Sequence, residues 1–478
     1  MDDTRTDMPR GSWRELVGRT YAPVAAVLAG GVLLEASNVY LTTSLLPTVV
    51  DDIGGREFYA WIMTAFLVAS VVSSMLVSRM LTTQGSVRAY LLAFALFGLG
   101  SLVAALSPSM GVFLAGRAVQ GLGGGLLAGL GYALIQRSLP ERLWAKGAAL
   151  VSAMWGVGNL LGPAVGGLFG QLGVWRPAFG LLTALTVLLM ILVVTAIPRT
   201  QPVPSSSAIP AVSLVLLTAA VSAVSVAGIM PTVAATVVVL VVGLALGAGF
   251  LLHERSAAAA VLPAITFVRG SSLKWVYLTV GVLAFGIGTE TFIPLFGQEL
   301  GHLTPLLAGF LGAALSFGWA VAQVFSANAQ RAAVVRILVV GGPAVLAAGL
   351  LAYALLQSDR PAGLAVALWF VTLLVAGAGI GIAFPHLAVA AFGSVANDEE
   401  AAKASAGINT VFLIASAFSA ALAGVLVNLG EPSVLASARY LLVGFGLAAV
   451  LGVLPARAAS RPAVGSTAER SASTSTAA

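Results

Sequence analysis

Three ionisable residues, Glu35, Arg117 and Glu290, lie inside long apolar stretches of the chain. Ionisable side chains at membrane depth are energetically costly, and they commonly mark ion or substrate pathways. Burial in a medium of low dielectric favours the uncharged form of a carboxyl group, and an entering cation favours the carboxylate. The two acids therefore predict a site that exchanges a proton for a cation. The alternative for each acid is a neutral, hydrogen-bonded structural role, and for Arg117 a cation that snorkels or caps a carbonyl group.

The residues around Glu35 extend this prediction. Asn38 and Thr42 follow it by three and seven residues, so the three side chains share one face of a helix. A polar stripe of this kind should line a cavity and not face lipid. Glu290 also falls near the middle of its apolar run and is followed one turn later by Pro294. We expect the two acids to face one central cavity from opposite sides.

The composition indicates that these side chains are held by membrane-spanning helices. Hydrophobic residues make up 59% of the chain and charged residues 9%, against about 25% charged in soluble domains. Each spanning helix needs roughly 20 apolar residues. The chain has no cysteine, which excludes disulfides and thiolate metal sites, and its three histidines are scattered. We expect no metal and no other cofactor.

Fourteen apolar runs separated by short polar turns predict an all-α integral membrane protein. The runs are 22–50, 58–81, 90–106, 111–135, 145–172, 178–197, 211–230, 232–252, 278–296, 305–325, 334–356, 364–388, 404–427 and 435–454. They are arranged as six, two and six. The alternative is twelve spans, with the central pair re-entrant or peripheral.

The organisation of the chain follows from these runs. We predict an N-terminal cytoplasmic segment without a signal peptide, a six-helix half, a Pro/Ser-rich linker, two additional transmembrane helices, a cytoplasmic connection, a second six-helix half and a disordered cytoplasmic tail. These segments are 1–21, 22–197, 198–210, 211–252, 253–277, 278–454 and 455–478.

The loop charges predict the orientation. Only four of the 24 Lys and Arg residues, namely Arg56, Arg176, Arg360 and Arg439, fall in the outer loops if both termini are inside, and Arg117 lies within a span. An excess of Lys and Arg in the inner loops is typical of membrane proteins. The sequence therefore predicts a multi-pass protein of the cytoplasmic membrane with N-in and C-in topology. The net charge of +6 reflects this topology and requires no nucleic-acid partner.

A glycine-rich run within 145–172 predicts a close contact between helices. Gly158, Gly162, Gly166 and Gly170 recur at every fourth residue and so share one helix face. A bare face of this kind lets another helix approach backbone to backbone, which is how helices pack in lipid. Pro163 removes one helical hydrogen bond, and neighbouring helices can compensate for it inside a membrane.

Three motifs resemble the major facilitator superfamily. Gly158-x-x-x-Gly162-Pro163-x-x-Gly166-Gly167 resembles the antiporter motif on the fifth helix of its drug–proton exchangers. Gly116-Arg117-Ala118-Val119-Gln120-Gly121 resembles the R-x-x-Q-G motif of the fourth helix, and Trp61-Ile62-Met63-Thr64-Ala65-Phe66 resembles the start of helix 2 in the 14-helix drug-exporter branch.

The resemblance implies a fold and a set of roles. The fold would be two six-helix halves related by an axis along the membrane normal, with two extra central helices. Arg117 would take part in proton handling with Glu35 and Glu290, and Gln120 would line the cavity with Asn38 and Thr42. Gly85 and Arg88 would remain from the gating motif of the loop between helices 2 and 3.

The sequence departs from that family in two places. The branch carries an acid nine residues before a Leu-Pro proline of helix 1, but counting back from Pro47 gives Asn38, and the acid occurs one turn earlier as Glu35. The loop motif is eroded, with Thr82 at the position of its acid, so we expect a different inner gate.

These observations predict a secondary transporter, not an enzyme. We expect a monomer that exports a small amphiphilic or cationic molecule and uses the proton gradient as its energy source. No G-x-x-x-x-G-K-[ST] nucleotide loop occurs, which argues against an ATP-driven pump. Two alternatives are an exporter of a lipid or of a dedicated natural product, and a non-transporting receptor or scaffold. The last would be expected to carry a sizeable soluble domain.

Overall fold

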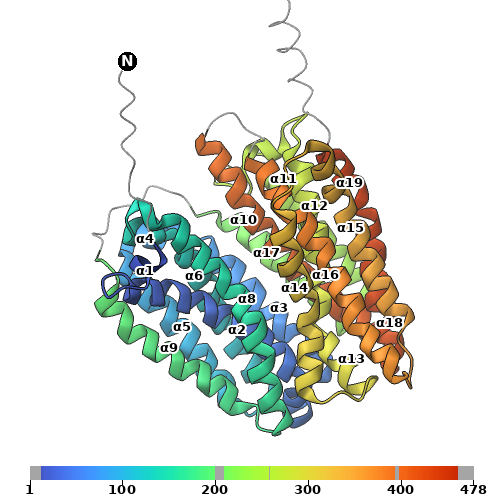
Figure 1. Cartoon of the computed structure of the whole chain (residues 1–478). Helices are drawn as coiled ribbons and strands as arrows, with labels where there is room; N and C mark the ends of the chain where they lie inside the picture. Colours follow the sequence, from blue (N-terminus) through green and yellow to red (C-terminus); the bar gives the residue numbers. More distant parts are fainter. Residues whose placement is uncertain (1–11, 200–208, 258, 393–397, 461–478) are drawn as a thin grey trace, which may run out of the picture.

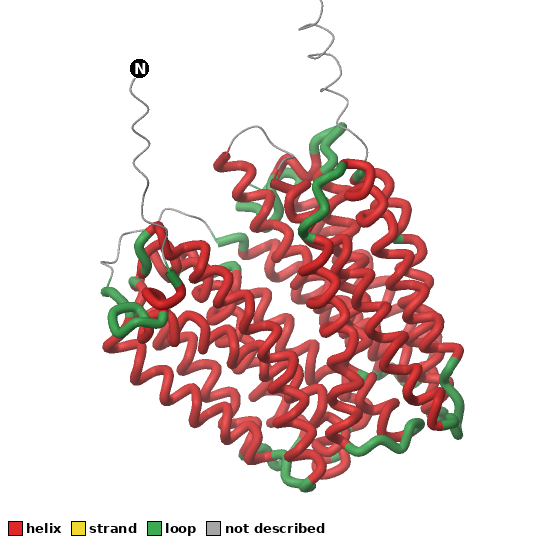
Figure 2. Tube along the Cα trace, viewed as in Figure 1, coloured by secondary structure: helices red, strands yellow, loops and turns green. Residues whose placement is uncertain are grey.

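The computed structural model describes residues 12–199, 209–257, 259–392 and 398–460, and this part of the chain is helical without any strand (Figure 2). The helices form two groups, one from each half of the chain, which meet at one end of the molecule and diverge toward the other (Figure 1). Helices α4 and α19 lie at the end where the groups diverge.

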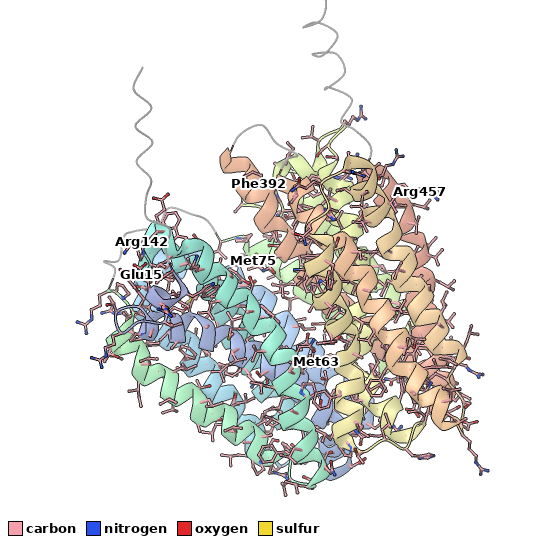
Figure 3. All side chains as sticks on the ribbon, viewed as in Figure 1. Glu15, Met63, Met75, Arg142, Phe392 and Arg457 are labelled. Atoms are coloured by element: carbon pink, nitrogen blue, oxygen red, sulfur yellow. The ribbon has the colours of Figure 1, made fainter. Side chains whose placement is uncertain are left out.

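The N-terminal group is built from six long helices and four short ones. Its elements are α1 Trp13–Leu16, α2 Ala22–Ile53, η1 Arg56–Phe58, α3 Tyr59–Ser74, α4 Val77–Gln84, α5 Ser86–Ala105, α6 Met110–Ala133, α7 Ile135–Ser138, α8 Glu141–Gln171 and α9 Arg176–Ala196. The short α1 is held against α8, because Arg142 Nη2 donates a hydrogen bond of 2.6 Å to Glu15 Oε1 (Figure 3). This hydrogen bond and the positive charge of Arg142 hold the pKa of the Glu15 carboxyl group below its ordinary value.

The central pair and the C-terminal group follow. Their elements are α10 Ala211–Gly228, α11 Val233–Glu254, η2 Ala264–Phe267, α12 Leu273–Ile287, η3 Gly288–Thr291, α13 Ile293–Glu299, α14 Pro305–Ser326, α15 Ala332–Leu355, α16 Gly363–Phe392, α17 Asp398–Gly430, α18 Val434–Leu451 and α19 Val453–Ala459. Helix α10 packs against both α17 and α3, and α11 packs on α10.

Thirteen helices of the described residues are long and apolar enough to cross a membrane. Helix α6 is not among them, although it has 24 residues and corresponds to the predicted span 111–135. Its many glycines, together with Arg117 and Gln120, lower its mean hydropathy. The structure therefore supports a multi-pass membrane protein.

Two predicted spans are broken helices. The predicted span 58–81 is interrupted at Met75, between α3 and α4. The hydroxyl groups of Ser73 and Ser74 donate to the carbonyl oxygens of Ser70 and Val71, and such bonds compete with the helical ladder. Helix α4 then continues to Gln84, so most of the predicted inner loop motif is helical.

The predicted span 278–296 begins earlier, at Leu273, and changes to a 3-10 turn around Glu290. Pro294 has no N–H group to donate to the carbonyl oxygen of Glu290, four residues before it, and this loss explains the local change of helix type.

The ends of the predicted segments also need correction. Residues 453–459, most of which we predicted to be part of a disordered tail, form α19, because the apolar run continues past Pro455. The rest of the predicted tail, the N-terminal segment before residue 12 and most of the linker 198–210 lie outside the described residues.

The predicted glycine face of α8 packs directly on α2. A Cβ atom built on Gly158 would lie 2.6 Å from Ala36 Cβ, one on Gly162 would lie 2.5 Å from Tyr40 Cβ, and one on Gly166 would lie 2.6 Å from Leu41 O. These distances leave no room for a side chain. Helices α2 and α8 are therefore in close contact along this face, which confirms the predicted helix contact and identifies α2 as the partner.

The same contact predicts the effect of substitution. Gly162→Leu should destabilise the protein by roughly 1–3 kcal/mol, because the added side chain must push α2 away. Gly156→Leu is the matched control on the same helix, since a Cβ at Gly156 meets no atom within 4 Å. The measurement is the thermal unfolding midpoint of both purified variants in detergent. Equal midpoints for the two variants would show that this contact is not close-packed.

Candidate functional site

A cavity of about 550 Å³ lies between the two halves, within the range of small-molecule sites. Both halves contribute to it, and Met75, one of its lining residues, lies between them where they diverge (Figure 3). Its lining residues are Glu35, Ser70, Ser74, Met75, Val77, Ser78, Leu81, Gly125, Ala128, Gly129, Ala133, Arg137, Trp155, Asn409, Thr410 and Leu413. Small, hydroxyl-bearing and apolar side chains predominate, with one acid and one base.

Glu35 is the acid of this cavity. Its side chain is nearly buried, and its Oε2 atom has no hydrogen-bond partner in the described structure. Gly124 of α6 makes room for it, because a Cβ there would lie 3.3 Å from Glu35 Cγ and 2.9 Å from Phe66 Cζ. A buried carboxyl group that lines a cavity and lacks a protein partner can accept a proton or face a cationic ligand.

Arg117 lies beside this site, fully buried at the centre of the N-terminal half. Its Nη1 atom donates to Asn38 Oδ1 at 2.9 Å and also to Gln120 Oε1. Its Nε atom donates to Ile62 O at 3.3 Å, and its guanidinium group lies 4.4 Å from the centre of the Phe66 ring. No carboxylate of the described residues forms an ion pair with it. Arg117 therefore joins α6 to α2 and α3 through neutral groups.

The expected cavity-lining role of Asn38, Thr42 and Gln120 needs correction in this structure. All three side chains are fully buried, and none lines the cavity. Thr42 Oγ1 donates to Asn38 Oδ1 at 3.3 Å, and Gln120 Nε2 donates to Ser101 Oγ at 2.7 Å. The polar stripe faces the neighbouring helices, where Asn38 accepts a hydrogen bond from Arg117.

Glu290 also differs from the expectation, since it does not line the cavity that contains Glu35. Its Oε1 atom accepts hydrogen bonds from Ser316 Oγ at 2.5 Å and from Ser316 N at 3.0 Å. Tyr40 of α2 in turn donates to Ser316 Oγ at 2.9 Å. The two acids are thus not placed across one cavity. Glu290 belongs to a hydrogen-bond chain that crosses from the C-terminal to the N-terminal half.

The end at which the halves meet is closed by charges and by close packing. Arg56 forms ion pairs with Glu299 at 3.1 Å and with Glu431 at 3.4 Å, both in the other half. Gly167 faces the first turn of α14, where a Cβ would lie 2.6 Å from Leu306 Cα. This end is therefore sealed while the cavity lies between the halves.

The remaining predicted residues lie at the opposite end. Gly85 has a φ of +77° and forms the turn between α4 and α5, a conformation that favours glycine. Arg88 is exposed and forms no ion pair with a described residue. Thr82 Oγ1 donates to Arg79 O at 2.9 Å, within α4. Thr82, at the position of the motif's acid, therefore bonds within its own helix.

Three polar residues that form buried hydrogen bonds were not predicted from the sequence. Tyr40 and Ser316 carried no signal, since single hydroxyl groups are common in spans. Glu254 ends α11 and is buried, where it accepts from Ser213 Oγ and, at 2.7 Å, from Leu262 N. The polar residues that follow it made it look like part of a loop.

The chain is similar to known proteins both in sequence and in fold. A family model described as Major Facilitator Superfamily matches residues 28–420. A protein of Mycobacterium tuberculosis named a probable multidrug-efflux transporter is 49% identical over 459 residues, which cover 94% of this chain and 97% of the relative.

Solved structures share the fold at low sequence identity. A transporter of the POT family in complex with 5-aminolevulinic acid matches with a TM-score of 0.67 and 15% identity, over 94% of this chain and 97% of that one. A D-xylose–proton symporter matches with a TM-score of 0.64 and 16% identity, over 91% and 97%.

The contacts of Arg117 predict that substitutions of Asn38 differ in how much they destabilise the protein. Asn38→Leu should cost roughly 1.5–3 kcal/mol, because it removes a hydrogen bond to a buried charged group. Asn38→Asp keeps the acceptor and should be less destabilising, although aspartate is far more polar than leucine. The matched control is Asn159→Leu, since Asn159 is also buried but its Oδ1 atom has no described partner. Thermal unfolding of the three purified variants provides the measurement, and an Asn38→Leu protein as stable as the Asn159→Leu protein would contradict the prediction.

Proposed function

The chain belongs to the major facilitator superfamily, and on that premise we propose that this secondary transporter exports small amphiphilic cations across the cytoplasmic membrane in exchange for protons. Alternating access around a central site between two halves is the general mechanism of such folds. The observation that carries the proposal is the cavity between the halves, which contains a nearly buried acid without a protein partner.

The topology that we propose has fourteen spans with both termini in the cytoplasm. Helix α6 is the span that brings the total from thirteen to fourteen, since it has the length to cross a bilayer and packs between α3 and α5. The low hydropathy of α6 is acceptable because its polar groups face neighbouring helices and not lipid. The end where the halves diverge is then the cytoplasmic end, and the closed end carrying Arg56 is the outer end.

In this orientation the cavity is the inward-facing binding site. A cationic drug-like molecule entering from the cytoplasm would meet Glu35, and its apolar part would contact side chains such as Met75 and Trp155. The cation would stabilise the Glu35 carboxylate, and the proton held there would be released. The small side chains around the site suit cargoes of varied shape.

Glu290 has a different part in this proposal. It lies in the 3-10 turn between α12 and α13, and it reaches α2 through Ser316 and Tyr40. As a carboxylate, Glu290 accepts charge-assisted hydrogen bonds from Ser316, and these are roughly twice as strong as bonds to a neutral carboxyl group. Protonation of Glu290 would therefore weaken the chain that joins the halves, so that proton binding is linked to opening of the outer end.

The expected consequence is that both acids are needed for coupling. Glu35→Gln and Glu290→Gln should each abolish accumulation of a cationic substrate driven by a pH gradient in proteoliposomes. Downhill movement should persist, since it needs only alternating access. Glu35→Gln should be the more severe change, because Glu35 lies in the cavity and a cation also loses its Coulomb partner.

The matched control is Glu254→Gln, which alters a buried acid away from the cavity and should retain accumulation. If the double variant of Glu35 and Glu290 still concentrates a cationic substrate against its gradient, neither acid couples the cycle. If wild-type protein transports the cation but ignores the pH gradient, the proton part of the proposal is wrong.

The outer seal gives a separate prediction. Arg56→Ala should favour the outward-open state, because it removes the ion pairs to Glu299 and Glu431 across the halves. The natural chain has no cysteine, so Ser44→Cys, at the seam between α2 and α14, would supply a single thiol. We expect its labelling by an impermeant maleimide from outside to rise several-fold in the Arg56→Ala background.

The control for this experiment is Arg176→Ala, because Arg176 pairs with Asp52 inside one half. That change should leave the labelling rate unaltered. An Arg56→Ala protein that labels no faster than its Arg176→Ala counterpart would show that the Arg56 ion pairs do not hold the outer end closed.

A further inference from the structure

A second groove, of about 460 Å³, lies away from the central cavity and is lined by residues of α15 and α19. Its lining residues are Arg336, Ile337, Val340, Gly341 and Arg457. None of them lines the cavity that contains Glu35. Figure 3 shows Arg457 at the edge of the C-terminal half that faces away from the N-terminal half. The groove therefore opens toward the surroundings of the protein and not toward the transport site.

The two arginines give the groove its charge. Arg336 and Arg457 come from different helices and are exposed, and their guanidinium groups form no hydrogen bond or ion pair with a described residue. No acidic residue lines the groove. Two guanidinium groups that converge without a protein partner favour a phosphate group, which they can bind through paired N–H donors. At the cytoplasmic end of the molecule the nearest phosphates are those of the inner leaflet.

The rest of the groove is apolar and open. The Ile337 side chain is 69% exposed, and Leu454 of the adjacent helix is 63% exposed. A Cβ built on Gly341 would meet no atom within 4 Å, so the groove has free space above this glycine. Arg336 and Gly341 are five residues apart on α15, which places the apolar floor further along the helix than the charge. A ligand that fits has an anionic head and a hydrocarbon tail.

We propose that this groove is a binding site for an anionic phospholipid of the cytoplasmic leaflet. The phosphate lies between Arg336 and Arg457, and an acyl chain lies over Gly341. Basic pockets between transmembrane helices on this side of a membrane are suited to such headgroups. The lipid stabilises the packing of α19 against α15 because it contacts both helices.

The test uses native mass spectrometry of the delipidated full chain, titrated with phosphatidylglycerol, with phosphatidylcholine or with inorganic phosphate. Wild-type protein should retain one phosphatidylglycerol in preference to phosphatidylcholine, and inorganic phosphate should not displace it because it lacks a tail. Arg336→Gln with Arg457→Gln should weaken this binding roughly tenfold or more. Gly341→Leu should also weaken it, because leucine fills the groove without meeting the protein.

The control is Arg331→Gln, which removes one positive charge from the start of the same helix outside the groove and should leave binding unchanged. Equal binding of the two phospholipids to wild-type protein would overturn the proposal. So would a loss in the Arg331→Gln protein as large as that in the double variant, since the effect would then be one of overall charge. Retention of phosphatidylglycerol by both the double variant and the Gly341→Leu protein would exclude this groove as the site.

Discussion

Close contact between helix backbones is the interaction on which this structure depends. In lipid the hydrophobic effect does not draw apolar helices together, so van der Waals contact between closely fitting surfaces must do so. The glycines of α8 provide such a surface on two sides. Gly162 faces α2 within the N-terminal half, and Gly167 faces α14 of the other half. Helix α8 therefore belongs both to the core of one half and to the seam between the halves.

A second constraint is the pairing of polar side chains at membrane depth. Arg117 satisfies its donors with neutral acceptors, which leaves it without a carboxylate among the described residues. Glu290 accepts two hydrogen bonds from one serine, whereas the Oε2 atom of Glu35 has no described partner. The N-terminal half thus contains a rigid buried network next to a free acid, and the contrast between the two acids gives them separate parts in the cycle that we propose.

The sequence was sufficient for the helical architecture and for a close helix contact on the glycine face of α8, although it did not identify α2 as the partner, because the spacing of small and apolar residues reports directly on helix faces. It also placed Glu35, Glu290 and Arg117 in the buried interior. It could not predict which polar groups form hydrogen bonds with one another. Partners such as Tyr40 and Ser316 are 276 residues apart, and only the tertiary packing of their helices brings them together. For the same reason Asn38 was expected in the cavity, although it faces Arg117. The 3-10 turn at Glu290 could have been predicted from the sequence, because Pro294 removes the hydrogen bond to the carbonyl oxygen of Glu290.

The composition of α6 has a consequence for how the protein is made. A helix with an arginine inside its span and so many glycines partitions poorly into a bilayer by itself, since a charged side chain at membrane depth is costly at insertion. The groups that Arg117 and Gln120 need are supplied by Asn38, Ile62 and Ser101, which all precede α6 in the sequence. When α6 leaves the ribosome, α2, α3 and α5 have already been synthesised and can receive it. The order of helices along the chain is thus also a workable order of assembly at the translocon, in which the least hydrophobic span enters last among its partners.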